Sequence, residues 1–171
     1  MQLIERIQLP SNQASIVFSS IPNTFTHLLI KLSGRTTASG DFRPGLQLNS
    51  TSILESENLY GVGSGSASGV NYTNGRIGFG VDAADQTAST FGSMDFLILD
   101  YLSTTRKAIL VEAVTENGAT SAYHSISGGQ SGVTSAITSI TLTPPSLNFT
   151  QDSAASLFGI LVGSDGITTV S

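Results

Sequence analysis

The sequence predicts an all-β protein, a single antiparallel β-sandwich or jelly roll of about ten strands. Short runs of Val, Ile, Leu, Phe and Thr alternate along the chain with clusters of Gly, Ser, Asn, Asp and Pro. No stretch has the i, i+3, i+4 apolar spacing of an amphipathic helix. Because the chain has 171 residues and no cysteine, we expect one domain over 1–171, stabilised by packing or assembly rather than by disulfides.

The clearest strand lies at 27–33, where Leu28, Ile30 and Leu32 share one face while Lys31 and Ser33 share the other. Asn117-Gly118 predicts a type I′ turn between two strands. The glycine-rich segments 61–69 and 128–132 are expected to be surface loops. The remaining strands are expected at 3–9, 15–18, 45–49, 53–60, 76–81, 93–101, 107–115, 120–127, 136–143 and 156–162.

Composition excludes several classes of function. Charged residues make up 11% of the chain, Ser and Thr together about a quarter, and the net charge is −5 with a pI near 4.7. The seven basic residues are scattered, which argues against binding to nucleic acid or to an acidic membrane surface. We see no signal peptide and no apolar run of membrane-spanning length, and therefore expect synthesis in a cytoplasm.

The segment 91–115 is apolar on both faces of two successive strands. A strand of this kind must be covered on its second side by loops of its own domain or by another chain, and both alternatives stay open. If another chain covers it, one face packs inside the sandwich and the other lies in a subunit interface. The residues we assign to that interface are Leu97, Leu99, Tyr101, Ile109 and Val111.

Several phrases of the sequence resemble a family of virion proteins from tailed bacteriophages. They are ASTFG followed by DY at 88–101, TENGAT at 115–120 and AITSITL at 136–142. The family comprises small jelly-roll proteins that decorate capsids or form part of head fibres and tail appendages. The resemblance implies a virion protein without enzymatic activity or cofactor. It also implies a homo-oligomer, dimer or trimer, whose partner is the major capsid protein or another virion protein.

Within that expectation, a capsid decoration or cement protein is the first interpretation. Residues 1–12 would serve as a docking arm that adds a strand to a sheet of the shell, and 163–171 would form a flexible tail. The apolar side chains of that arm are Leu3, Ile4, Ile7 and Leu9.

The alternative is a tail-fibre or receptor-binding module that recognises host-surface glycan. Tyr60, Tyr72 and Tyr123 lie beside loops, where their rings could stack on sugars, but they equally fit the rim of a sandwich core. The chain contains no Trp, and this absence makes glycan recognition the less favoured interpretation.

No arrangement of residues predicts catalysis or a metal site. His27 and His124 accompany no GxSxG motif, and we interpret both as strand residues with ordinary hydrogen bonds. Glu55 and Glu57 share a strand face, as solvated acids often do. Asp82 and Asp85 lack the spacing of a calcium loop and fit turn hydrogen bonds.

Overall fold

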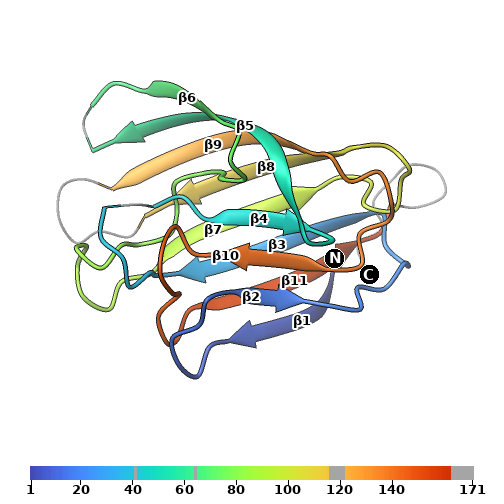
Figure 1. Ribbon diagram of the computed structural model, residues 1–171, viewed down its shortest axis with the longest axis horizontal. Helices are drawn as coiled ribbons and strands as arrows, with labels where there is room; N and C mark the ends of the chain where they lie inside the picture. The colour runs from blue at the N-terminus through green and yellow to red at the C-terminus, as the bar shows by residue number, and fades with distance from the viewer. Residues whose placement is uncertain (41, 64, 116–121, 163–171) are drawn as a thin grey trace.

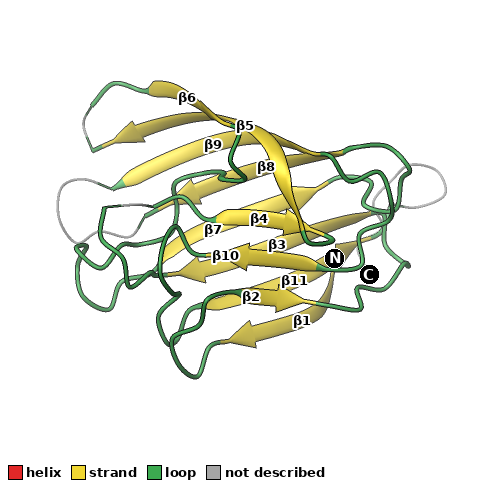
Figure 2. Ribbon diagram, in the orientation of Figure 1, coloured by secondary structure: helices red, strands yellow, loops and turns green. Residues whose placement is uncertain are grey.

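The structure, a computed structural model, describes residues 1–40, 42–63, 65–115 and 122–162. This part of the chain forms eleven β-strands and no helix (Figure 2), so none of it could cross a membrane as a helix. All pairs of these strands are antiparallel. The predicted all-β antiparallel sandwich is confirmed.

The strands form two layers that share one long strand (Figure 1). The larger layer runs in the order β1 (Gln2–Gln8), β11 (Ala154–Ile160), β3 (His27–Gly34), β7 (Gly92–Ile98), β8 (Lys107–Val114), β9 (Tyr123–Ser131), β5 (Thr51–Val62) and β6 (Ser68–Tyr72). The smaller layer runs from the start of β5 to β4 (Gly45–Leu48), β10 (Ile140–Thr143) and β2 (Ile16–Phe18).

β5 passes from one layer to the other. Thr51 and Ser52 pair with β4, whereas the strand from Ile53 onward pairs with β9, and the register shifts between Ile53 and Glu55. A bulge of this kind bends a strand and increases its twist. In Figure 1 the strands β4, β10 and β2 consequently lie in front of the central strands of the larger layer.

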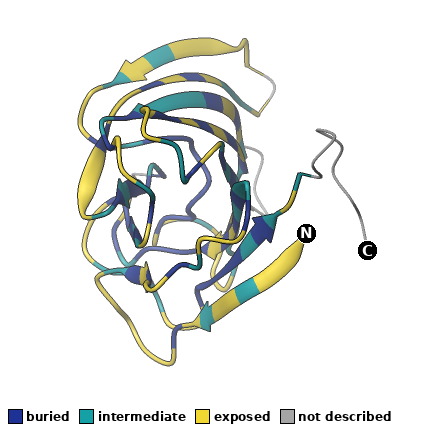
Figure 3. Ribbon diagram, turned by 90° about the vertical axis from the view of Figure 1, so that its right-hand side faces the viewer, coloured by how far each residue is buried: buried dark blue, intermediate teal, exposed yellow. Residues whose placement is uncertain are grey.

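The main core fills the space between the two layers. Alternate residues of β7 and β8 point into it, and Phe96, Ile98 and Val111 are at most 1% exposed. From the smaller layer, Leu46 and Leu142 face them and are fully buried. Figure 3 shows the same alternation as dark bands along the strands.

The predicted strand at 76–81 is wrong. This segment crosses the interior at one end of the sandwich, with Gly78 at a φ of 72° and with Ile77 and Val81 fully buried. Two of its backbone nitrogens bond to inward-facing side chains: Gly78 N donates to Asn58 Oδ1 at 2.8 Å, and Phe79 N donates to Ser125 Oγ at 3.0 Å. Other backbone nitrogens of the segment donate to the carbonyl oxygens of Phe42 and Pro44 at 3.0–3.2 Å. Side chains of β5 and β9 and an irregular stretch of main chain thus hold this segment in place of a ladder.

The two expected glycine-rich loops are also wrong in part. The segment 61–69 contains the end of β5 and the start of β6, a strand that the sequence did not predict. Most of 128–132 belongs to β9. Gly129 is needed there because a Cβ at this position would lie 2.8 Å from Ile77 Cδ1, so the glycine makes room for the interior segment.

The predicted turn at Asn117-Gly118 and the predicted tail at 163–171 lie outside the described residues. The strands on either side of the predicted turn do pair, with Val114 opposite His124, as consecutive arms of a hairpin must.

Arg35 holds the long connection between Val81 and β7. The side chain is only 9% exposed, and its guanidinium donates to the carbonyl oxygens of Ala84, Gln86, Thr87 and Thr90 at 2.8–3.3 Å. A planar group with five donors can satisfy several carbonyls at once. This loop is therefore anchored by one buried cation, and the strand β7 starts from a fixed position.

The connection between β7 and β8 is fixed by Tyr101 and Lys107. The Tyr101 hydroxyl donates to Pro22 O and accepts from Phe25 N, and burial raises the pKa of this phenol against the lowering effect of the Phe25 bond. Lys107, 1% exposed, donates from Nζ to Ser103 O at 2.7 Å. Burial lowers the pKa of Lys107.

Candidate interaction surface

The outer sheet face, meaning the side of the larger layer turned away from the smaller layer, carries a row of apolar side chains across five strands. Directly opposed residues define the row from β1 through β11, β3 and β7 to β8. Leu3 and Leu110 at its ends are 52% and 51% exposed, and the three side chains between them are partly exposed. The members of this apolar row are Leu3, Phe158, Leu29, Leu97 and Leu110.

A second row runs beside the first, two residues away on each strand except β1, where a register shift between Leu3 and Glu5 makes the step three residues. Its members are Arg6, Ser156, Lys31, Asp95, Glu112, Ile126 and Leu59. Lys31 forms an ion pair with Asp95 on the neighbouring strand. The basic residues thus lie on the β1 side of the row, the two acids in the middle, and Ile126 and Leu59, 65% and 57% exposed, on the β5 side.

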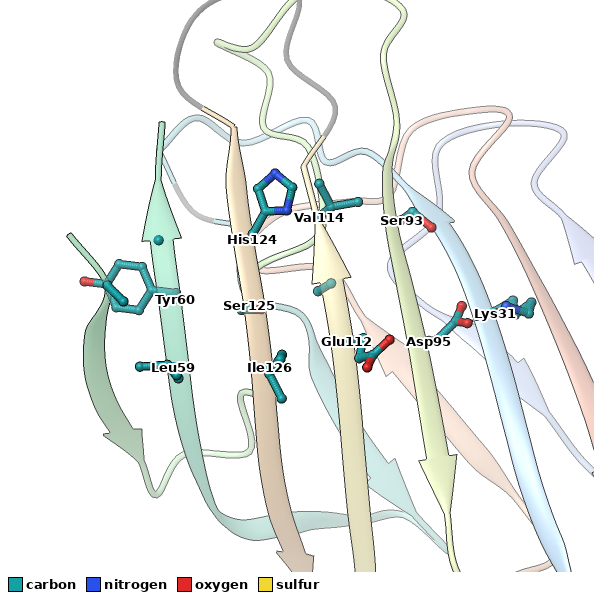
Figure 4. Close-up of a pocket in the computed structure, with 13 residues that line it drawn as sticks. Lys31, Leu59, Tyr60, Ser93, Asp95, Glu112, Val114, His124, Ser125 and Ile126 are labelled. Atoms are coloured by element: carbon teal, nitrogen blue, oxygen red, sulfur yellow. Dashed lines mark hydrogen bonds and ion pairs between the residues drawn. The ribbon is translucent and has the colours of Figure 1, made fainter. Parts of the chain in front are cut away.

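Two shallow depressions on the outer sheet face follow this charged row. The larger, about 680 Å³, extends over Asp95 and Glu112 to Ile126 and Leu59, and Figure 4 shows these side chains rising from neighbouring strands. The smaller, about 430 Å³, lies over β1, β11 and β3. Both depressions include Lys31 and Asp95, so the ion pair marks the middle of the surface.

The structure corrects the predicted interface residues. Tyr101, Ile109 and Val111 are at most 1% exposed and lie in the core, so they cannot contact another chain. Leu97 and Leu99 are partly exposed, and Leu97 lies opposite Leu110 rather than Ile109. Leu110 belongs to the outer sheet face but was not assigned to it.

The residues predicted to form a docking arm form part of the sandwich. β1 pairs with β11 along its length, Leu9 is 4% exposed, and Ile4 and Ile7 pack against the core. Of the four apolar residues only Leu3 is largely exposed. The prediction of a free arm over 1–12 is therefore wrong for residues 2–9, although β1 remains an edge strand of its layer.

Tyr60, Tyr72 and Tyr123, which lie at or near strand ends, form an aromatic cluster with two phenylalanines. Phe79 stacks on Tyr60 at 4.5 Å between ring centroids and on Tyr123 at 5.6 Å, and Phe42 lies 4.6 Å from Tyr123. Tyr72 lies 6.3 Å from Phe79. These rings pack against a satellite of the core, as the rim interpretation expects.

His27, Asp85 and the acids of β5 have the structural positions expected of them, whereas the full burial of Asp82 was not expected. His27 Nδ1 accepts a hydrogen bond from Asp100 N at 3.0 Å, and Asp85 Oδ1 accepts one from Gly40 N at 3.2 Å. Glu55 and Glu57 are exposed on β5, and Asp82 is fully buried between Gly34 and Thr36. Among the described residues, no three His, Asp or Glu side chains cluster closely enough to hold a metal ion.

No protein-family model, curated protein or solved structure matches the chain. The outer sheet face and the resemblance noted in the sequence are therefore the two observations that bear on function.

Proposed function

We propose that the chain is a non-enzymatic structural protein of a tailed-bacteriophage virion. Its role is that of a capsid decoration or cement protein, bound as a homo-oligomer to the major capsid protein on the outer surface of the head. The single observation that carries the proposal is the apolar outer sheet face, because a sheet whose other side already packs a complete core has no internal use for it.

The outer sheet face is large enough to matter energetically. Four of its large apolar side chains, Leu3, Leu59, Leu110 and Ile126, are each more than half exposed. Covering a side chain of this size stabilises a complex by about 1.5–3 kcal/mol when the burial is complete. Soluble monomers rarely expose contiguous apolar surface of this kind, which typically marks a binding site. The protein is thus suited to work inside an assembly.

The virion setting is supported by the resemblance, and the phrases that carry it have structural roles. Ile140 and Leu142 of the AITSITL phrase are fully buried in β10. Gly92 of the ASTFG phrase is tightly packed, since a Cβ there would lie 2.2 Å from Gly80 O. Because the AITSITL and ASTFG phrases supply buried positions of the sandwich, the resemblance in these two phrases concerns residues that build the fold.

Retention on capsids tests the proposal. Capsids of the phage that encodes the chain, assembled without it, would be mixed with the purified protein and sedimented. We expect hundreds of copies to remain on each particle after washing, through the avidity of many weak contacts. A folded protein that stays in the supernatant at every ratio would refute the proposal.

A glycan-recognition module is the second candidate, favoured by the larger depression. Polar groups of Lys31, Asp95 and Glu112 stand there beside the apolar Leu59 and Ile126, a combination that suits sugar rings. The aromatic cluster speaks against it, because Tyr60 and Tyr123 use their rings to pack Phe79. Binding of the purified protein to host-surface polysaccharide, lost on Glu112→Gln, would favour this function over the first.

A further inference from the structure

We propose that a second copy of this chain covers the outer sheet face, related to the first by a two-fold axis that runs along the strands between β3 and β7. The inference rests on the proposed function and specifies the geometry of the homo-oligomer that it includes. It commits to a self-complementary contact, in which the same surface is used by both copies.

The order of the strands is compatible with this axis. Three strands, β1, β11 and β3, lie on one side of it, and five, β7, β8, β9, β5 and β6, lie on the other, of which the first three are those that the rotation covers. A two-fold rotation about a line in the sheet surface places β3 over β7 of the second copy, β11 over β8 and β1 over β9. The strands of the two sheets then run in nearly the same direction, which is the aligned class of sheet packing.

The apolar row is complementary to itself under the same rotation. Leu29 faces Leu97 of the second copy, and Phe158 faces Leu110. Leu3, at the end of the row, faces Gly128 of the second copy, since Gly128 lies opposite Leu110 on the next strand. No atom lies within 4 Å of a Cβ built on Gly128, so there is room for the exposed leucine.

The charged row provides the stronger argument. Lys31 and Asp95 lie directly opposite each other on β3 and β7, one on each side of the axis. In the dimer, Lys31 of each copy therefore faces Asp95 of the other, and the four charges alternate in sign around the axis. A row with two charges of the same sign at these positions would repel its own copy.

The outer ends of the charged row also fit. Arg6 lies on β1 and Glu112 on β8, so the rotation brings the two onto neighbouring strands of opposite copies. Glu112 itself faces Ser156, a hydroxyl, rather than another carboxylate. Arg6 itself faces Ile126, the neighbour of Glu112 on β9. The direct charge complementarity thus comes from Lys31 and Asp95, and Arg6 adds to it from the strand beside Glu112.

The surface has the size of an ordinary dimer contact. Six strands at about 4.8 Å span roughly 29 Å, and four alternate residues along each strand span roughly 20 Å. The flat footprint is then roughly 600 Å² per copy, and side-chain relief brings the accessible area close to the ~800 Å² that each partner buries in a standard interface.

A pair of charge variants tests the geometry. Lys31→Asp leaves two acids beside the axis, and Asp95→Lys leaves two bases, so each variant repels itself while the two attract each other. Both side chains are exposed, at 49% and 39%, and circular dichroism would confirm that both variants fold. Molecular mass would be measured by light scattering at about 50 µM, where a standard-size contact is largely occupied.

We expect the wild type to be a dimer, with twice the chain mass of 17.7 kDa. Each variant alone should be a monomer of 17.7 kDa. The equimolar mixture of the two variants should again have the mass of a dimer. A monomeric wild type would overturn the proposal. So would dimers formed by either variant alone, or a mixture that stays monomeric, because the two-fold geometry requires the opposite.

A matched pair of apolar substitutions locates the contact independently. Leu110→Lys, on the outer sheet face, should abolish the dimer. Val17→Lys should leave it intact, because Val17, 47% exposed, lies on the smaller layer. Equal loss in both variants, or in neither, would contradict the assignment of the face. Capsid retention is measured separately. A dimer that does not bind capsids refutes the function and not the dimer, whereas a monomer that binds capsids refutes the oligomer and leaves the capsid binding in place.

Discussion

The hydroxyl of Tyr101 offers a sharp test of how the connection between β7 and β8 is held. The side chain is completely buried, and its hydroxyl bridges to the loop before β3 by donating to Pro22 O and accepting from Phe25 N. Tyr101→Phe keeps the ring in the core and removes only the bridge. The substitution therefore isolates two hydrogen bonds from the packing around them.

The expected loss follows from the two groups that remain. Each hydrogen bond contributes about 0.5–1.5 kcal/mol net, and a buried partner left without its bond costs about 1–3 kcal/mol. Phe25 is 7% exposed, so its N–H keeps little access to water. We expect the free energy of unfolding to fall by about 2–3 kcal/mol, which for a chain of this length lowers Tm by roughly 4–12 °C.

The same substitution has a predictable dependence on pH. Burial raises the pKa of Tyr101 above its usual value of 10.0 in the unfolded chain. The contribution of the phenol is therefore complete below pH 10 and is lost as the pH rises through its folded pKa. The difference in stability between the wild type and Tyr101→Phe should accordingly narrow above pH 10. Lys107, whose lowered pKa acts in the opposite direction, contributes equally to both proteins.

Urea unfolding at pH 8, 10 and 11 would measure both effects. Tyr60→Phe is the matched control, because the Tyr60 hydroxyl makes no hydrogen bond to any residue that the structure describes. An unchanged midpoint for Tyr101→Phe, or a stability difference that stays constant with pH, would refute the assignment of the bridge.

Two further predictions concern packing and the buried cation. Gly159→Ala would place a Cβ 2.2 Å from the Phe25 ring, and we expect thermal unfolding to show a loss of about 1–3 kcal/mol, whereas Gly128→Ala, in open space, should stay within about 0.5 kcal/mol. Arg35→Met would deprive several carbonyls of the loop 84–90 of their donor, and we expect a loss of about 3 kcal/mol in urea unfolding. The exposed Arg106→Met should cost under about 1 kcal/mol, and equal losses would contradict the role of Arg35.

The sequence predicts that β7 and β8 are apolar on both faces. It does not predict the register between them, which decides which residues of β8 share a face with Leu97. Alternation predicts which residues of one strand share a face. Whether Leu97 lies beside Leu110 or beside Ile109 depends on how many residues the connection uses, because a shift of one residue turns every side chain of the second strand to the other face. Tyr101 fixes that number through a bond to a backbone group distant in the sequence, and Lys107 through a bond within the loop. Neither bond leaves a local sequence pattern.

The interior segment 75–81 escaped prediction for a related reason. Its apolar residues alternate like those of a strand, yet its backbone hydrogen bonds go to the side chains of Asn58 and Ser125 and to the carbonyl oxygens of Phe42 and Pro44. Those polar residues in turn made β5 and β9 look less buried than they are. The conformation of the segment and the burial of these strands both depend on contacts between residues twenty or more positions apart. Composition and periodicity do not reveal such contacts.

β1 illustrates the same limit for the candidate site. The apolar residues of β1 suggested a docking arm because no pattern in the first twelve residues identifies β11 as their pairing partner. β11, about 150 residues later in the chain, forms the antiparallel hydrogen bonds with β1. Only the structure brings Leu3 into line with Leu110 across five strands.

The central claim is that another protein surface covers the outer sheet face when the chain is at work. Cryo-electron microscopy of intact particles of the encoding phage tests it most directly. We predict density for many copies on the head, with Leu97 and Leu110 packed against another chain and, in the specific form proposed, against a second copy. Well-resolved copies in which the outer surfaces of β3, β7 and β8 face only solvent would contradict the claim.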